Sequence, residues 1–171
     1  RRIGPLPERT VLAVALEAAR GLRQAASHGA LHGDLSPASV IVDAGGRVRV
    51  LGAGLRCVVR PGEDAPLAPE FASPERLAGT EAPDARSDIY ALGLVLFEVF
   101  TGRRAYEART LSDLKQLHDT GTVTTPSSIV RDIDPSVERV ILRCLSKDPH
   151  LRPASALTVA AALPGGDPLA A

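Results

Sequence analysis

The sequence predicts a mainly helical α+β domain in which several helices surround one buried central helix. Three observations support this class. Apolar residues recur at helical spacing in several segments, and the segment from Ile89 to Phe100 is apolar almost all round. Two short apolar strands flank a glycine-containing turn near residue 45. A helix without a polar face is buried, so we expect residues 89–100 to form the centre of the core.

The composition is that of one folded domain. The 171 residues suffice for a hydrophobic core, and 44% of them are hydrophobic. Lys plus Arg and Asp plus Glu number 20 each, so the formal net charge is zero and no long-range field favours nucleic acid or an anionic membrane. No apolar run is long enough to span a bilayer, and no signal-peptide pattern is present. We therefore expect a cytoplasmic domain with no nucleic acid partner and no membrane segment.

The cysteines and two of the histidines are expected to have no chemical role. Cys57 and Cys144 have no metal-type spacing, so we interpret them as small, partly buried apolar side chains rather than as a disulfide or a redox pair. His118 and His150 are expected at the surface.

The first helix is predicted to begin at Pro7 and Glu8, because proline suits the first helical position and an acidic residue suits the first turn. It is predicted to end at His28 and Gly29, where the glycine provides a left-handed cap. Its apolar face is formed by residues at helical spacing: Leu12, Ala15, Leu16, Ala19 and Leu22.

A β-hairpin is predicted next, with strands over Ser39–Val42 and Arg47–Leu51 and a turn over Asp43–Gly46. Residues 52–72 are irregular and contain three prolines. A loop of this length inside a compact domain is usually functional, so we expect it to lie near the site.

The second half of the chain is predicted to be helical. Ser87 is expected to cap the central helix, which ends at Gly102. Three further helices are predicted, over Leu111–His118, Pro135–Leu145 and Ala154–Leu163. The Pro- and Gly-rich residues 164–171 are interpreted as a tail or linker, so the domain is expected to comprise residues 1–163.

Five motifs follow one another in an order and spacing that one known family shares. They are "LHGDLSPASV", similar to the catalytic loop H-R-D-L-K-P-x-N-[VI]; "VRVLGAGL", similar to the strand leading into D-F-G; "FASPERLAG", similar to the A-P-E segment; "RSDIYALGLVLFEVFTGRRAY", similar to the central helix; and "LSKDPHLRP", similar to a late Arg-Pro motif. Together they resemble the C-terminal lobe of a bacterial serine/threonine protein kinase, over nearly the whole chain.

The resemblance implies a kinase-like C-lobe with an activation-segment loop. Active members of the family use ATP and magnesium, and the Gly-rich loop and strand lysine that hold ATP lie upstream of the catalytic loop. About 30 residues precede His32 here, and they are predicted to form one helix. We therefore expect this chain, which begins at Arg1 rather than Met, to be part of a longer protein. Within the chain we expect no N-terminal lobe, no complete nucleotide site, no cofactor and no metal.

The resemblance also assigns the catalytic positions. Asp34 aligns with the family's catalytic base. The magnesium-binding Asn aligns with Ser39, and the magnesium-binding Asp and the Phe of D-F-G align with Gly52 and Ala53. The lysine that contacts the transferred phosphate aligns with Ser36. Magnesium prefers carboxylate and phosphate oxygens, so ordinary kinase turnover is not expected.

The regulatory positions are altered as well. The arginine of H-R-D, which pairs with a phosphorylated activation loop in the family, aligns with Gly33. The matching segment, Leu55–Ala72, contains no Ser, Thr or Tyr, and the Thr that precedes A-P-E aligns with Ala68. Both the phosphate receptor and the phosphate acceptor are therefore missing.

The structural positions of the family are retained. His32 aligns with the histidine that packs the catalytic loop, and Asp88 with the acid that holds the loop's backbone. Glu75 and Arg152 align with an ion pair that joins the activation segment to the base of the lobe. We therefore expect a lobe that keeps the fold of the family but lacks its metal-binding and phosphate-binding residues.

Each of these assignments has a plainer alternative. Asp34 alone could be a turn or cap residue, residues 52–54 a flexible turn, and Glu75 and Arg152 solvated charges.

Three hypotheses for the function remain open. The first is a pseudokinase-like regulatory module in bacterial signalling, which binds a protein partner or an N-terminal kinase lobe. The second is a fragment of an active ATP-dependent Ser/Thr kinase with Asp34 as catalytic base. The third is a helical interaction domain that descends from a kinase. A Gly-rich loop and a strand lysine upstream favour the second, and their absence favours the third.

Overall fold

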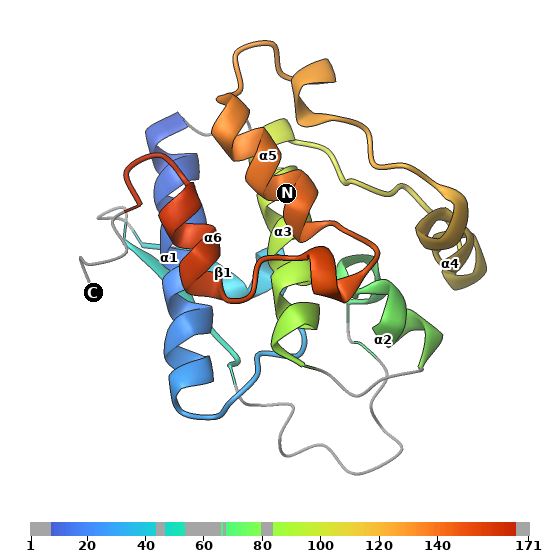
Figure 1. Cartoon of the computed structure of the whole chain (residues 1–171), viewed down its shortest axis with the longest axis horizontal. Coiled ribbons are helices and arrows are strands. Elements are labelled where there is room, and N and C mark those ends of the chain that lie inside the picture. The colour runs from blue at the N-terminus through green and yellow to red at the C-terminus, as the bar shows by residue number, and fades with distance from the viewer. Residues whose placement is uncertain (1–7, 44–46, 54–65, 67, 80–83, 167–171) are drawn as a thin grey trace.

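The computed structural model describes residues 8–43, 47–53, 66, 68–79 and 84–166, and it shows a helical domain with one small sheet (Figure 1). The helices and strands are α1 (Glu8–Ser27), β1 (Val40–Val42), β2 (Val48–Val50), α2 (Pro74–Ala78), α3 (Ala85–Thr101), α4 (Leu111–Thr120), α5 (Pro135–Cys144) and α6 (Ala156–Ala162). Short 3₁₀ turns span Pro37–Ser39, Pro69–Phe71, Pro126–Ser128 and Pro149–Leu151. The predicted mainly helical class is confirmed.

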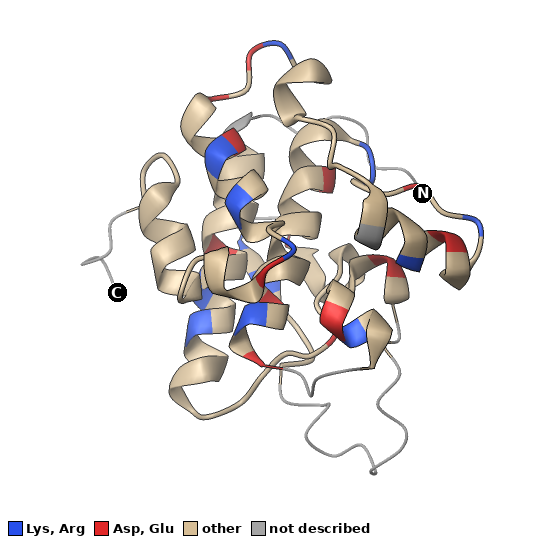
Figure 2. Ribbon diagram, turned by 45° about the vertical axis from the view of Figure 1, so that its right-hand side comes forward, with Lys and Arg blue, Asp and Glu red and all other residues tan. Residues whose placement is uncertain are grey.

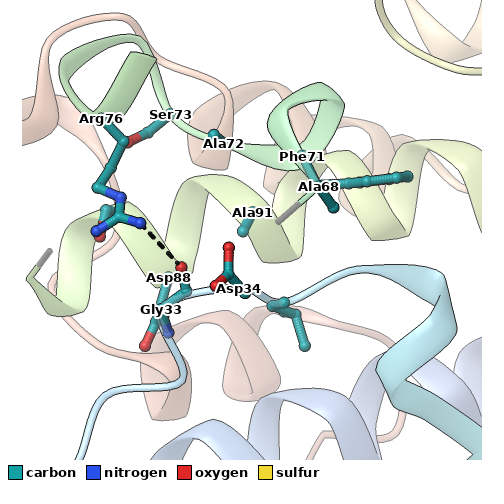
Figure 3. A pocket seen from close by; sticks show the side chains of 11 residues that line it. Gly33, Asp34, Ala68, Phe71, Ala72, Ser73, Arg76, Asp88 and Ala91 are labelled. Atoms are coloured by element: carbon teal, nitrogen blue, oxygen red, sulfur yellow. Dashed lines mark hydrogen bonds between the residues drawn. The ribbon is translucent and has the colours of Figure 1, made fainter. Parts of the chain in front are cut away.

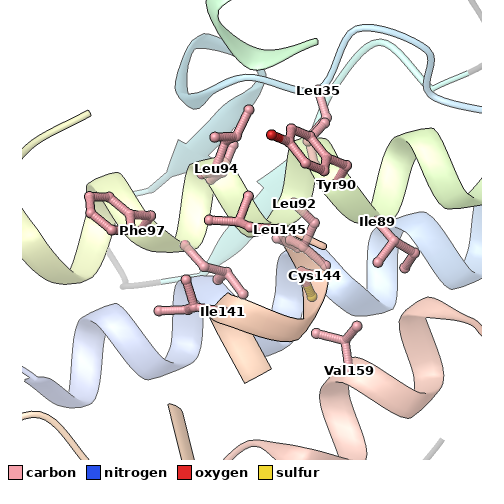
Figure 4. Packing of buried hydrophobic residues seen from close by; sticks show 14 of the residues in the cluster. Leu35, Ile89, Tyr90, Leu92, Leu94, Phe97, Ile141, Cys144, Leu145 and Val159 are labelled. Atoms are coloured by element: carbon pink, nitrogen blue, oxygen red, sulfur yellow. The ribbon is translucent and has the colours of Figure 1, made fainter. Parts of the chain in front are cut away.

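Helix α3 forms the centre of the core, as its all-round apolar pattern predicted. Its residues from Ser87 to Phe97 are all buried, and it packs against α1 and α5 (Figure 1). A Cβ atom on Gly93 would lie 2.7 Å from Cβ of Cys144, so the absence of a side chain lets α3 and α5 approach closely. Figure 4 shows buried side chains around this crossing, among them the aromatic rings of Tyr90 and Phe97.

Helix α1 supports the hairpin and also packs against α6. It ends where the sequence predicted, because Gly29 has a φ of +69° and takes the left-handed cap position. Strands β1 and β2 pair antiparallel, with Val40 opposite Val50 and Ile41 opposite Arg49. The small sheet therefore lies over α1, with the catalytic-loop motif entering it.

Both strands are shorter than predicted. Ser39 belongs to a 3₁₀ turn rather than to β1, and Leu51 follows β2. The amide of Leu51 still donates to the carbonyl oxygen of Ser39, at 2.8 Å, so the ladder continues for one hydrogen bond beyond the strands. Residues 44–46 of the predicted turn lie outside the described residues.

The predicted start of α3 is wrong by three residues. Asp84 is the cap residue, and its carboxylate accepts from the amide of Ser87 at 2.7 Å. Ser87 returns a hydrogen bond by accepting from the amide of Asp84 at 3.1 Å, which completes a reciprocal capping box. In the same way Ser155 caps α6, which begins at Ala156 rather than at the predicted Ala154.

The prediction that His118 lies at the surface is also wrong. The side chain is 2% exposed, and its Nδ1 lies 2.9 Å from the hydroxyl oxygen of Tyr90. The ring of Tyr106 lies 4.3 Å from the imidazole, centroid to centroid. His118 therefore anchors α4 to α3, whereas His150 is exposed as predicted.

Cys144 is a free, fully buried thiol, and burial raises its pKa to about 12. It behaves as a small apolar side chain, whereas Cys57 lies outside the described residues.

None of the described helices combines the length and apolarity needed to cross a bilayer. Among the described residues, positive and negative side chains are interspersed along the ribbon (Figure 2).

Candidate functional site

The loop that contains Asp34 is fixed to α3 by the carboxylate of Asp88. Oδ2 of Asp88 accepts from the amide of His32, and Oδ1 accepts from the amide of Gly33, both at 2.8 Å. Burial raises the pKa of Asp88 above its ordinary value, and hydrogen bonds from the two amides oppose this rise. The structure thus places His32 and Asp88 in the contact that the resemblance implied.

His32 links the same loop to the end of β2. Its side chain is 3% exposed, and Nε2 lies 2.8 Å from the carbonyl oxygen of Leu51. A carbonyl only accepts, so Nε2 carries the proton in this contact. Nδ1 in turn accepts from the amide of Asp34 at 3.3 Å. The imidazole therefore sets the distance between the catalytic-loop motif and Gly52, which follows Leu51.

Asp34 lies at the wall of a small pocket between its own loop, the segment that includes α2, and α3 (Figure 3). Phe71 and Ala91 contribute apolar surface, and Ser73 and Arg76 contribute polar groups. A carboxylate at this wall can accept a proton from a hydroxyl group that enters the pocket. The role of Asp34 as a catalytic base stays a prediction of the resemblance.

The hydroxyl of Ser39 is used within its own loop. It donates to the carbonyl oxygen of Ser36 at 2.8 Å and accepts from the amide of Ser36 at 3.1 Å. These two bonds form the cap of the Pro37–Ser39 turn. The side chain at the family's metal-binding Asn position is thus engaged in turn formation, and Ser36 itself is 8% exposed.

Gly52 offers only backbone at the position of the family's magnesium-binding Asp. Its φ is +90°, in the left-handed region that favours glycine. Ala53, at the Phe position, is exposed and does not pack into the core.

These residues do not fit a magnesium–ATP complex of the kind the family binds. A hard cation needs several oxygen ligands, and none of the positions assigned to the metal or the phosphate, Ser36, Ser39 and Gly52, carries a carboxylate. Within the described ranges, no group of three or more His, Cys, Asp or Glu side chains is arranged to hold a metal ion.

Glu75 and Arg152 meet at the base of the lobe. Nη1 of Arg152 lies 2.6 Å from Oε1 of Glu75, and Nη2 lies 2.8 Å from Oε2. Burial by itself raises the pKa of Glu75, but hydrogen bonds, of which that from Arg152 is the largest, hold the pKa below its ordinary value. The guanidinium also lies over the ring of Tyr90, 4.7 Å from its centroid.

Position 33 cannot easily accept the arginine that the family places there. Gly33 has a φ of +78°, which a residue with a side chain adopts only with strain. Ala68 lies at the edge of the Asp34 pocket and has no hydroxyl to offer. Most of the preceding segment, 54–65 and 67, lies outside the described residues.

Arg76 belongs to the site and was not predicted from the sequence. It is 8% exposed, and its Nη2 donates to the carbonyl oxygen of Gly33 at 3.5 Å (Figure 3). No local pattern indicates its burial, because the contact joins α2 to a loop 43 positions earlier in the chain.

The comparisons with known proteins agree with this geometry. Residues 1–162 match the family described as protein kinase domain. The chain is 33% identical to the serine/threonine-protein kinase pkn3 of Myxococcus xanthus over 167 residues, which cover 89% of the chain and 30% of that protein. It is 29% identical to the serine/threonine-protein kinase PknB of Mycolicibacterium smegmatis over 156 residues, which cover 87% of the chain and 25% of that protein. The chain belongs to the protein kinase family.

The chain spans between a quarter and a third of the length of these curated relatives. Its helices and two-stranded sheet are those of a kinase-like C-lobe. The relatives support a domain of the bacterial serine/threonine type.

Proposed function

We propose that this lobe is a pseudokinase-like module that binds a protein partner in bacterial signalling and does not transfer phosphate by the metal chemistry of its family. The observation that carries the proposal is the state of the two metal positions. Gly52 has no side chain, and the Ser39 hydroxyl bonds its own turn. Removing one preorganised electrostatic group typically lowers an enzymatic rate about 10²–10³-fold, so two such losses argue against turnover.

The retained scaffold supports a role in binding. Asp88 holds the loop backbone, and Arg152 is buried against Glu75. Buried charges are costly unless they are paired, so a lobe with these pairs intact has a defined surface to present. In this proposal residues 1–163 form a cytoplasmic lobe, and residues 164–171 form a linker.

The outer face of the hairpin supports the same role. Ile41 is 46% exposed and Leu51 is 49% exposed, and both are large apolar residues. Ile41 lies opposite Arg49, so an apolar surface with one cation stands next to Gly52. Such a surface suits a protein partner, of which an N-terminal kinase lobe is one example.

The second candidate is an active kinase fragment in which Asp34 is the catalytic base. The observation in its favour is the placement of Asp34 at the pocket wall, on a loop anchored by Asp88. In that case the metal ligands come from residues that the family does not use.

Phosphotransfer in the full-length protein separates the two candidates. We expect no labelled-phosphate transfer from ATP that depends on Asp34, so wild type and Asp34→Asn give the same signal. Asp132→Asn, at an exposed position, is the matched control. Transfer that Asp34→Asn abolishes and Asp132→Asn retains would establish the active kinase instead.

Nucleotide binding by the 171-residue chain gives an independent measurement. We expect one thermal transition whose midpoint does not move with ATP and magnesium. A ligand at 100 times its Kd stabilises a folded protein by about 2.7 kcal/mol, so binding at that level is easily detected. A clear nucleotide-dependent shift would contradict the proposed loss of the site.

A further inference from the structure

Arg76 reaches from α2 to the loop that contains Asp34. The guanidinium is buried, and its Nη2 faces the carbonyl oxygen of Gly33 at 3.5 Å (Figure 3). The amide of the same residue, Gly33, donates to Asp88 at 2.8 Å. Gly33 is therefore held through its amide by α3 and through its carbonyl by α2.

We propose that Arg76 is a positioning residue that fixes this loop from α2, in place of the arginine that the family carries at Gly33. In the family that arginine depends on a phosphate group in the activation loop. Arg76 supplies a positive charge from the opposite side of the loop, and no phosphate is needed to hold it. The inference rests on the proposed function as a binding module. It states how that module is regulated: the loop is ordered without phosphorylation.

The charges around Asp88 explain why a cation is required here. Asp88 is 7% exposed, and the titratable groups around it are His32 on the loop, Arg76 on α2 and Asp34 across the pocket. Burial raises the pKa of Asp88, and the positive charge of Arg76 is among the groups that oppose the rise. Without Arg76 the buried carboxylate of Asp88 would lose one of the positive charges that stabilise its ionised form, the form that accepts from the two loop amides.

The pH dependence distinguishes this role from simple packing. A carboxyl group whose pKa is raised on folding destabilises the fold as the pH rises through the folded pKa. Replacing Arg76 by a neutral residue raises the pKa of Asp88 further. The loss of stability in such a variant is therefore expected to be larger at pH 8 than at pH 5, whereas a packing defect costs the same at both.

Hydrogen exchange in the full-length protein tests the proposal directly. We compare Arg76→Gln with Arg104→Gln, because the Arg104 side chain is half exposed and pairs with Glu70 and Glu98. In Arg76→Gln, at pH 8, we expect the amides of residues 32 and 33 to exchange about tenfold faster than in wild type. In Arg104→Gln we expect no more than about a twofold change.

Arg76→Lys keeps the charge and is expected to restore slow exchange to within about threefold of wild type. If Arg76→Gln does not fold, Arg76→Lys provides the test. The proposal would be overturned if the amides of residues 32 and 33 in Arg76→Lys exchanged as fast as those of an unstructured peptide. Equal exchange in Arg76→Gln and Arg104→Gln, or a destabilisation that is the same at pH 5 and pH 8, would also overturn it. Exchange is measured without nucleotide, so the outcome is independent of whether the lobe transfers phosphate.

Discussion

Arg152 joins Glu75 across 77 positions of the chain through two parallel hydrogen bonds. The Arg152 side chain is fully buried, and that of Glu75 is 10% exposed. The remaining donors of the guanidinium are used as well, on the carbonyl oxygens of Ser146, Arg86 and Lys147. One side chain thus ties together α2, the start of α3 and the segment after α5.

Removal of this pair is expected to be strongly destabilising. Arg152→Ala leaves the Glu75 carboxylate buried without its partner, so we expect a loss of about 3–5 kcal/mol in the free energy of unfolding. Arg20→Ala is the matched control, because Arg20 pairs with Glu17 on the exposed face of α1 and should cost less than about 1 kcal/mol. Urea denaturation measures both. Equal losses of unfolding free energy in the two variants would show that the buried pair stabilises the fold no more than an exposed pair does.

The same pair predicts a pH dependence. The pKa of Glu75 is held below its ordinary value of 4.5, so the folded protein binds this proton less readily than the unfolded chain. The stabilisation is therefore fully present above about pH 4.5 and is lost as the pH falls through the folded pKa. We expect the difference in unfolding free energy between wild type and Glu75→Gln to shrink between pH 7 and pH 3. A difference that stays constant over this range would contradict the assignment.

The close crossing of α3 and α5 predicts that two Gly→Ala substitutions change the unfolding free energy by different amounts. A Cβ on Gly93 meets Cβ of Cys144 at 2.7 Å, where neither helix can yield locally. Gly93→Ala is therefore expected to lower the unfolding free energy by about 1–3 kcal/mol. A Cβ on Gly21 meets Cγ2 of Val50 at 3.0 Å and Cβ of Val50 at 3.1 Å, which is a milder overlap than the one at Gly93. With the gain in helix propensity, Gly21→Ala should change stability by less than about 1 kcal/mol. The prediction is wrong if both variants unfold at the same urea concentration.

The parts of the fold that the sequence predicted correctly depend on local patterns. The all-round apolar run of α3 and the left-handed glycine after α1 are visible in short windows of sequence. Helix α2 has five residues, too few for a periodic pattern, and it was not predicted. The sequence pattern predicts strand at Ser39, because Val40, Ile41 and Val42 after it have high strand propensity, and it does not reveal the hydrogen bonds that cap the turn.

The parts of the site that were missed depend on contacts between distant segments. His118 is buried because Tyr90 and Tyr106, from α3 and the loop after it, enclose it. Arg76 is buried because the loop of Gly33 lies over α2. A charged or titratable residue in an otherwise polar stretch is usually exposed, so neither burial follows from the local sequence.

The last prediction concerns substitutions that should restore phosphotransfer to this lobe. In a parent protein with a competent ATP-binding lobe, Gly52→Asp with Ser39→Asn is expected to create or raise phosphotransfer. Both substitutions place oxygen ligands where the family holds magnesium, and Asp34 already lies at the pocket wall. The φ of +90° at Gly52 costs the variant about 1–2 kcal/mol of stability, although Asp is among the residues that tolerate this region best.

Two further substitutions sharpen the test. Ser36→Lys should add to the activity of the double variant, because it neutralises charge on the transferred phosphate. Gly33→Arg should add little, since φ is +78° there and the segment 55–72 contains no phosphate acceptor for it to bind. The assay is labelled-phosphate transfer from ATP to a generic basic protein. The control is Asp34→Asn added to the triple variant Gly52→Asp/Ser39→Asn/Ser36→Lys. A wild-type protein as active as Gly52→Asp/Ser39→Asn/Ser36→Lys would mean that the lobe never lost its chemistry, and an unfamiliar metal site would then have to supply the missing ligands.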